Sequence, residues 1–143
     1  MGDLENRISE VSKAPRVTEA DVLNSIASCF FVTAYDAALN DRSVPVVGAE
    51  KIVPKELKVV TLAIVTNKAG FTVIGVSGCA DPKNFNAEIG EEIAKRNAVS
   101  QLWGHMGFVL REKLHEQETK RVSEKQAEDD MSAMPHAIGS MDE

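Results

Sequence analysis

The sequence has few of the residues and patterns that mark the most easily recognised protein classes. It has one tryptophan, one tyrosine and only two cysteines among 143 residues. Cys29 and Cys79 are too far apart for a CxxC pair or a metal-ligand spacing, so we expect two buried thiols in a reducing compartment. The apolar runs fall well short of the about 20 residues that cross a bilayer, and the polar start, "MGDLENRISEVSK", is unlike a signal peptide. These absences predict a cytoplasmic protein with no membrane partner.

Positive charge is also scarce. The chain carries 16 Lys and Arg against 22 Asp and Glu, for a formal net charge of -6, and it has no basic cluster. An acidic chain without a basic patch is not typical of a nucleic-acid binder, so we expect no nucleic-acid partner. A small anionic ligand stays open, because a few local donors can hold it.

Catalytic signatures are missing as well. The sequence has no Walker A, GxSxG, HExxH or Rossmann pattern, and its three histidines are scattered. Glu88, Glu91 and Glu92 crowd the start of a predicted helix, where they complement the macrodipole. Adjacent helical residues do not face each other, so paired acid–base chemistry is the weaker interpretation. The sequence predicts no enzyme, no cofactor and no metal.

The hydrophobic pattern predicts one domain over residues 16–114. A flexible arm (1–15) precedes it, and a charged helical extension with a disordered tail (115–143) follows. Thr18 and Asp21 resemble a capping box for a helix over 19–28, which a short strand or loop entry (29–35) and an irregular stretch (36–56) follow. Apolar runs at 59–65 and 71–76 flank the turn "NKAG" and predict an antiparallel hairpin.

From residue 84 the apolar period becomes helical. A long helix is expected up to Trp103, and Gly104 and Gly107 then predict a break before a second helix. The fold class is therefore α+β: a small antiparallel sheet (hairpin core) packed by a long C-terminal helix pair and a short N-terminal helix. So small a sheet needs its open face or edge covered, which predicts a dimer or higher homo-oligomer.

The stretch "CADPKNFN" (79–86) is the best candidate for a binding site. Asp81 and Asn84 are both natural helix caps, and one of them is in excess of what a single helix start requires. Phe85 is either a core residue in register with Ile89 and Ile93 or a stacking platform for a planar base, with Asn84 and Asn86 reading the base edge. A helix start also offers free N–H groups to a phosphate.

Asn97 extends the same apolar stripe, because it follows residues 85, 89 and 93 by four. A polar amide on that face needs a partner, since an unsatisfied buried group costs about 1–3 kcal/mol. Asn97 either bonds neighbouring backbone or, with the adjacent Arg96, faces a ligand or a second subunit. The candidate ligand-binding set therefore contains these residues: Asp81, Asn84, Phe85, Asn86, Glu88, Arg96 and Asn97.

Residues 70–110, "GFTVIGVSGCADPKNFNAEIGEEIAKRNAVSQLWGHMGFVL", resemble a phage protein family named after gene 49 and gene 66 of its founding phages. The shared pattern is "GFTV.G.S.C", then "DP.NF", then "E.G..IA..NA...LW...GF.L", and the likeness extends over roughly residues 17–114. The chain departs from the pattern in 40–56 and in its long charged C-terminus.

This family in turn resembles the Thoeris anti-defence proteins of phages. That resemblance implies a non-catalytic sponge for a cyclic ADP-ribose isomer, built from dimers with nucleotide pockets between protomers. Phe85 would then stack on a base, Asn84, Asn86 and Asn97 would hydrogen-bond, and Arg96 would pair a phosphate. Two alternatives stay open: a structural or host-protein-binding factor that docks through 105–130, and a nucleotide hydrolase using Glu88 or Glu92.

Overall fold

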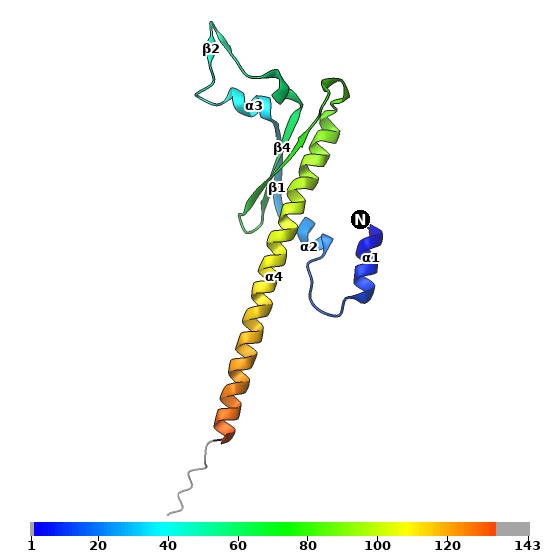
Figure 1. Ribbon diagram of the computed structural model, residues 1–143, viewed down its shortest axis with the longest axis vertical. Helices are drawn as coiled ribbons and strands as arrows, with labels where there is room; N and C mark the ends of the chain where they lie inside the picture. Colours follow the sequence, from blue (N-terminus) through cyan, green and yellow to red (C-terminus); the bar gives the residue numbers. More distant parts are fainter. Residues whose placement is uncertain (1, 134–143) are drawn as a thin grey trace, which may run out of the picture. The chain divides into compact units, whose positions relative to one another are not determined.

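The computed structural model describes residues 2–133 and has the predicted α+β fold (Figure 1). The chain divides after Met106 into two compact units, of which the first holds the sheet. The elements run in this order: α1 (Gly2–Val11), α2 (Glu19–Asn24), β1 (Ile26–Thr33), α3 (Ala34–Leu39), β2 (Val46–Val47), β3 (Glu50–Lys51), the 3₁₀ turn η1 (Lys55–Val59), β4 (Val60–Asn67), β5 (Thr72–Gly78), the 3₁₀ turn η2 (Pro82–Asn84) and α4 (Ala87–Ala133).

The main sheet has three antiparallel strands in the order β1–β4–β5. The predicted hairpin is confirmed as β4–β5. Its turn is closed by the Asn67 side chain, which accepts hydrogen bonds from the amides of Ala69 and Phe71, while Gly70 takes a positive φ of 86°. The third strand, β1, begins at Ile26, so the helix predicted over 19–28 is too long. Residues 26–28 pair with β4 instead, which satisfies their backbone groups in the sheet.

One face of the sheet carries the core. Strands β4 and β5 alternate strictly, and Ala63, Val65 and Val73 are buried together with Ala94 and Leu102 of α4. The backbones of β5 and α4 approach closely there, because a Cβ on Gly75 would lie 1.9 Å from the carbonyl oxygen of Ala94. Small residues thus let α4 lie directly on β5.

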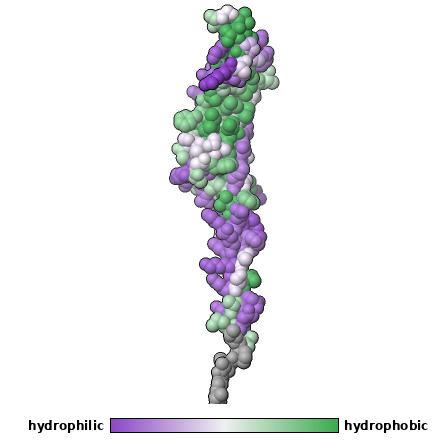
Figure 2. Space-filling model, turned by 90° about the vertical axis from the view of Figure 1, so that its left-hand side faces the viewer, coloured by the Kyte–Doolittle hydropathy of each residue, from purple (hydrophilic) through white to green (hydrophobic). Residues whose placement is uncertain are grey.

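The opposite face of the sheet is apolar, and no helix or strand among residues 2–133 buries it. Alternation places Leu62, Ile64, Ile74 and Val76 on this face, and Ile74 and Val76 are about half exposed. Phe30, which pairs with Ile64, lies on the same face and is 67% exposed. Figure 2 shows hydrophobic side chains gathered over the part of the chain that holds the sheet. Apolar strands of this kind normally pack against another element.

The predicted break at Gly104 and Gly107 is wrong, and with it the helix pair. Helix α4 runs unbroken from Ala87 to Ala133. A glycine inside a helix costs only about 1 kcal/mol relative to alanine, and good helix formers flank both positions without an intervening proline. Residues 131–133 of the predicted tail also belong to α4, and the rest of that tail lies outside the described residues.

Short elements lie in the two stretches predicted to be a mobile arm or loose helix (1–15) and an irregular segment (36–56). Residues 2–11 of the predicted arm form α1, and the Arg16 guanidinium lies 2.8 Å from the Glu5 carboxylate. Within the stretch predicted to be irregular, the end of α3 and the β2–β3 hairpin are ordered. Helix α3 begins because the Thr33 hydroxyl accepts a hydrogen bond from the Asp36 amide.

The capping box predicted at the start of α2 is confirmed and leads to a first testable expectation. The Thr18 hydroxyl accepts from the Asp21 amide at 3.0 Å, and the Asp21 carboxylate accepts from the Thr18 amide at 2.9 Å. These bonds hold the pKa of the Asp21 carboxyl below its ordinary 3.8. The stabilisation is therefore present above that value and is lost as the pH falls through the folded-state pKa.

Thr18→Ala removes the acceptor for the Asp21 amide. We expect it to lower the free energy of unfolding by about 1 kcal/mol, measured by urea denaturation at neutral pH. Thr18→Ser is the matched control, because it keeps the hydroxyl and should stay close to the parent. Equal losses for both variants would show that the methyl group, rather than the cap, matters at this position.

Candidate functional site

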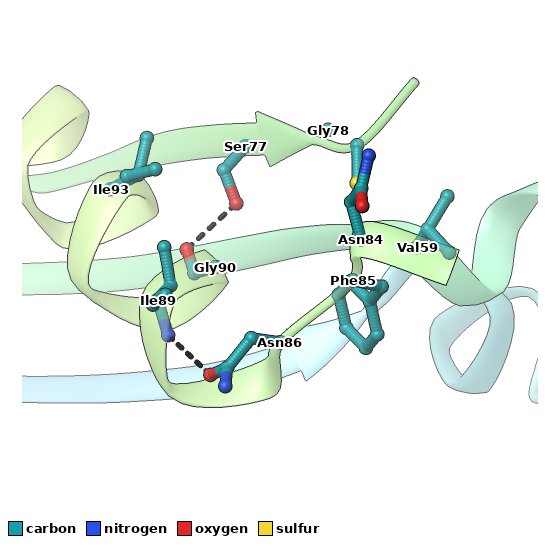
Figure 3. A pocket seen from close by; sticks show the side chains of 10 residues that line it. Val59, Ser77, Gly78, Asn84, Phe85, Asn86, Ile89, Gly90 and Ile93 are labelled. Carbon is teal, nitrogen blue, oxygen red and sulfur yellow. Dashed lines mark hydrogen bonds between the residues drawn. The ribbon is translucent and has the colours of Figure 1, made fainter. Parts of the chain in front are cut away.

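A hollow of about 110 Å³ lies where β5 ends and α4 begins (Figure 3). Its wall is mostly apolar and carries two asparagine side chains and an aromatic ring. The lining residues are Val59, Ser77, Gly78, Cys79, Asn84, Phe85, Asn86, Ile89, Gly90 and Ile93. The predicted motif at 79–86 therefore supplies four of the residues around a real concavity.

The motif folds as two successive helix starts, which accounts for its excess of caps. Asp81 caps the 3₁₀ turn η2 by accepting from the Lys83 amide at 2.9 Å, with Pro82 in the first turn. Asn86 then caps α4, because its Oδ1 accepts from the Ile89 amide at 3.1 Å. The Asn84 side chain caps neither helix start, and within residues 2–133 it has no hydrogen-bond partner.

Phe85 is half-buried and lines two hollows at once. The second hollow, of about 210 Å³, is bounded by Phe31, Val32, Thr33, Asp36, Thr61, Phe85, Ala87 and Glu91. A Cβ on Gly90 would lie 2.9 Å from the Thr61 hydroxyl and 3.6 Å from the Phe85 ring. The glycine therefore leaves room for the Thr61 hydroxyl, since 3.6 Å from the ring is an ordinary contact. The Ser77 hydroxyl donates to the Gly90 carbonyl at 2.7 Å and ties α4 to β5.

The remaining predicted site residues lie apart from this group. Asn97 donates from Nδ2 to the Val76 carbonyl at 2.8 Å. Of the two alternatives for this residue, the structure therefore has the bond to neighbouring backbone. Arg96 lies on the exposed surface, 3.9 Å from Glu92, and borders a separate hollow of about 290 Å³ with Asn97 and Trp103. Glu88 is exposed in the first turn of α4. Asn86 and Asn97 are separated by about three helical turns, roughly 16 Å.

Several lining residues were not singled out from the sequence. Ser77 follows Val73 and Gly75 at a spacing of two, so the strand period places a polar side chain on a buried face, which was a usable signal. Phe31 and Thr61 come to the second hollow from strands distant in sequence, and no local pattern indicates them. Cys79 is partly buried with a free thiol that donates to the Asp81 carbonyl, so it has a structural partner.

The hollow beside Phe85 is suited to holding a planar group. An aromatic ring offers a stacking surface, and the Asn84 amide offers both a donor and an acceptor. Among the described residues, 2–133, no cluster of three or more His, Cys, Asp or Glu side chains could hold a metal ion. No helix in the same part of the chain combines the length and apolarity needed to cross a bilayer.

A three-stranded sheet backed by one long helix, with an aromatic-lined hollow at the helix start, defines a small α+β protein with a candidate binding site. The chain belongs to the phage protein family described as "Phage protein (N4 Gp49/phage Sf6 gene 66) family", whose model matches residues 17–114. The predicted resemblance to that family is thereby confirmed over the same residues. Neither the curated proteins nor the solved structures contain a significant match.

Proposed function

We propose that this phage protein binds and sequesters a cyclic nucleotide immune signal, a cyclic ADP-ribose isomer, without cleaving it, in the host cytoplasm. The observation that carries the proposal is the position of Phe85 between two hollows, beside the free amide of Asn84. An adenine base would stack on the ring, and the asparagine amides would hydrogen-bond the edge of the base. Such a protein would protect the phage by lowering the free concentration of the signal.

The size of the hollow sets which part of the ligand it could take. Pockets that enclose a drug-sized ligand are about 300–1,000 Å³, whereas this hollow is about 110 Å³. It would take the base, and the ribose and phosphate groups would lie toward the larger hollow of about 210 Å³, which Phe85 also lines. Asp36 and Glu91 both border that second hollow, so phosphates placed there need a cation to offset their repulsion from the two carboxylates.

Arg96 is the cation we assign to the phosphates. It lies ten residues beyond Asn86 on α4, roughly 15 Å along the helix axis. A single compact ligand at Phe85 would not reach it within one chain. Arg96 would therefore serve a ligand bound between two copies, with the base on one protomer and the phosphates on the other. Its salt bridge to Glu92 is long and exposed and would not prevent this.

Phe85→Ala tests the stacking surface. Base–aromatic stacking is worth about 1–3 kcal/mol, so affinity for the cyclic ADP-ribose isomer should fall by about 5- to 150-fold in calorimetric titration. Phe85→Tyr keeps the ring and should bind within a few-fold of the parent. Phe108→Ala, at a phenylalanine that is 63% exposed in the second unit, is the control for losing an aromatic residue elsewhere.

The same complex distinguishes sequestration from catalysis. After binding, the protein is denatured and the released ligand is analysed by mass spectrometry. Recovery of the intact cyclic molecule is expected. Recovery of a hydrolysed product would overturn the sponge and favour an enzyme, and the absence of any binding would overturn the ligand assignment.

Helix residues 107–133 support a second candidate function, docking to a host or phage protein. In this unit Phe108, Val122 and Met131 are each more than 60% exposed among charged neighbours. Phe108 and Val122 fall on nearly the same face of α4, as the anchors of a helix that docks in a groove do, whereas Met131 lies on the opposite face. A chain ending at residue 114 separates the two functions: nucleotide binding with lost biological activity would favour the partner.

A further inference from the structure

The two edges of the β1–β4–β5 sheet are treated differently by the fold. On the β5 edge, the carbonyls of Ile74 and Val76 accept hydrogen bonds from Gln101 Nε2 at 2.6 Å and from Asn97 Nδ2 at 2.8 Å. Side chains from α4 therefore occupy the groups that an added strand would need. Edge strands are commonly protected in this way against unwanted pairing.

The β5 contacts also fix the direction of the backbone groups across the sheet. In an antiparallel ladder, neighbouring residues alternate between facing the partner strand and facing away from it. Because the Ile74 and Val76 carbonyls point away from β4, their partners Ile64 and Leu62 direct their own backbone groups toward β1. These β4 groups are the ones that bond β1.

The residues of β1 that face outward follow from this register. Phe30 pairs with Ile64 and Val32 with Leu62, so these two β1 residues bond β4. Cys29 and Phe31 alternate with them and direct their N–H and C=O groups to the outer edge. Within residues 2–133, no backbone hydrogen bond from outside the sheet reaches either residue.

Apart from a register shift between Ile26 and Ser28, strand β1 lacks the usual protections against pairing. It is eight residues long, "IASCFFVT", and has no charge and no proline. Phe30 and Phe31 are 67% and 38% exposed. A long, neutral, apolar strand with free backbone groups is a template for another strand.

We propose that β1 pairs antiparallel with β1 of a second copy of this chain, about a two-fold axis at Phe30. Cys29 of each copy then faces Phe31 of the other, and the outward N–H and C=O groups of both residues are satisfied reciprocally. The two Phe30 side chains face each other as a cross-strand aromatic pair, which covers the most exposed apolar side chain of the sheet.

A second copy suits this edge better than an unrelated strand for two reasons. A two-fold interface requires a surface complementary to itself, and an uncharged β1 meets this condition because no like charges come together. Pairing also joins the two open faces into one six-stranded apolar surface, because the axis is perpendicular to the sheet. The proposal rests on the sheet alone and holds whatever ligand the hollow takes.

Phe31→Pro is the decisive variant, because it removes one outward N–H from each copy and leaves the bonds to β4 intact. Proline is tolerated on an edge strand where its nitrogen faces solvent. We expect the wild type to sediment as a dimer and Phe31→Pro to dissociate at least tenfold more readily, with an unchanged far-ultraviolet spectrum. Phe31→Ala is the matched control: it loses the same ring, keeps the N–H and should remain dimeric.

Two further variants test the surface should Phe31→Pro fail to fold. Phe30→Lys brings two ammonium groups together across the axis and should also yield monomers. Ile74→Lys places the same charge on the same face, on the far strand, and should stay dimeric. A monomeric wild type, or a Phe30→Lys dimer as tight as the parent, would overturn the proposal.

Disulfide trapping tests the register. With Cys29 and Cys79 replaced by serine, Phe30→Cys should crosslink two copies on mild oxidation, because directly opposed residues of this kind have Cα atoms about 4.5 Å apart. Ser28→Cys and Val32→Cys should crosslink only when the two variants are mixed. A dimer in which Phe30→Cys gives no crosslink would place the interface elsewhere and overturn the assignment.

Discussion

Gly75→Ala is expected to destabilise the protein by about 3 kcal/mol, which is close to unfolding a domain of modest stability. An ideal Cβ at this position would lie 1.9 Å from the Ala94 carbonyl oxygen and 2.4 Å from the Ala98 nitrogen. Both atoms belong to the backbone of α4, so no side chain can rotate away to make room. Helix α4 would have to move off β5, and the core between them would lose contact.

Urea denaturation monitored by the single tryptophan, Trp103, measures this loss. Gly104→Ala is the control, since it makes the same chemical change in α4 where nothing lies within 4 Å of the added Cβ. That variant should gain about 0.5–1 kcal/mol from better helix propensity. A Gly75→Ala variant as stable as the parent would mean that α4 does not lie against β5 at this distance.

Leu102→Ala is the second large effect. Leu102 is the largest fully buried side chain of the described core and is completely inaccessible to solvent. Removing its outer carbons leaves a cavity beneath α4, which should cost about 2–5 kcal/mol of unfolding free energy. The midpoint should shift in chemical denaturation with little change in its dependence on urea, because the native state stays compact.

Leu23→Ala is the control for this core variant. Leu23 is 46% exposed on α2, next to the buried Val22, so its loss should cost well under 1 kcal/mol. Comparable losses at the two positions would indicate that α2 is packed against a partner surface that covers Leu23. A loss well under 1 kcal/mol for Leu102→Ala itself would contradict its placement in the core.

The two proposals meet at Phe31, although they are independent. Phe31 lies on the proposed dimer edge and also borders the hollow of about 210 Å³ beside Phe85. A second copy paired along β1 would therefore lie near the place where the ribose and phosphates are proposed to bind. If Phe31→Pro yields a folded monomer, ligand titration on it shows how much of the binding surface one chain supplies alone.

The local pattern of the sequence was sufficient for much of the secondary structure. The apolar runs at 59–65 and 71–76 with "NKAG" between them predicted the β4–β5 hairpin, and Thr18 with Asp21 predicted the start of α2. These features depend on neighbours a few residues apart, so a sequence pattern contains them completely. The glycines at 104 and 107 were misleading, because a small propensity cost does not outweigh continued helical hydrogen bonding.

The sequence pattern predicted only part of the candidate site. The motif at 79–86 correctly indicated a helix start, and its excess of caps is explained by two successive starts, η2 and α4. That Phe85 lines two hollows depends on β1 and β4, which lie far from it in the chain. Whether Asn97 bonds backbone depends equally on which edge of the sheet α4 covers.

The sequence by itself determined the α+β class, the hairpin, the membership of residues 17–114 in a phage protein family and the place where a binding site would begin. Only the tertiary structure decided that β1 pairs with β4 and that Asn97 and Gln101 cover the β5 edge. It also decided that no strand among residues 2–133 pairs with the outer edge of β1. The physical reason is the distance in sequence between the residues that interact. Caps, turns and strand periods are set by adjacent residues, whereas edges and hollows exist only once distant segments lie side by side.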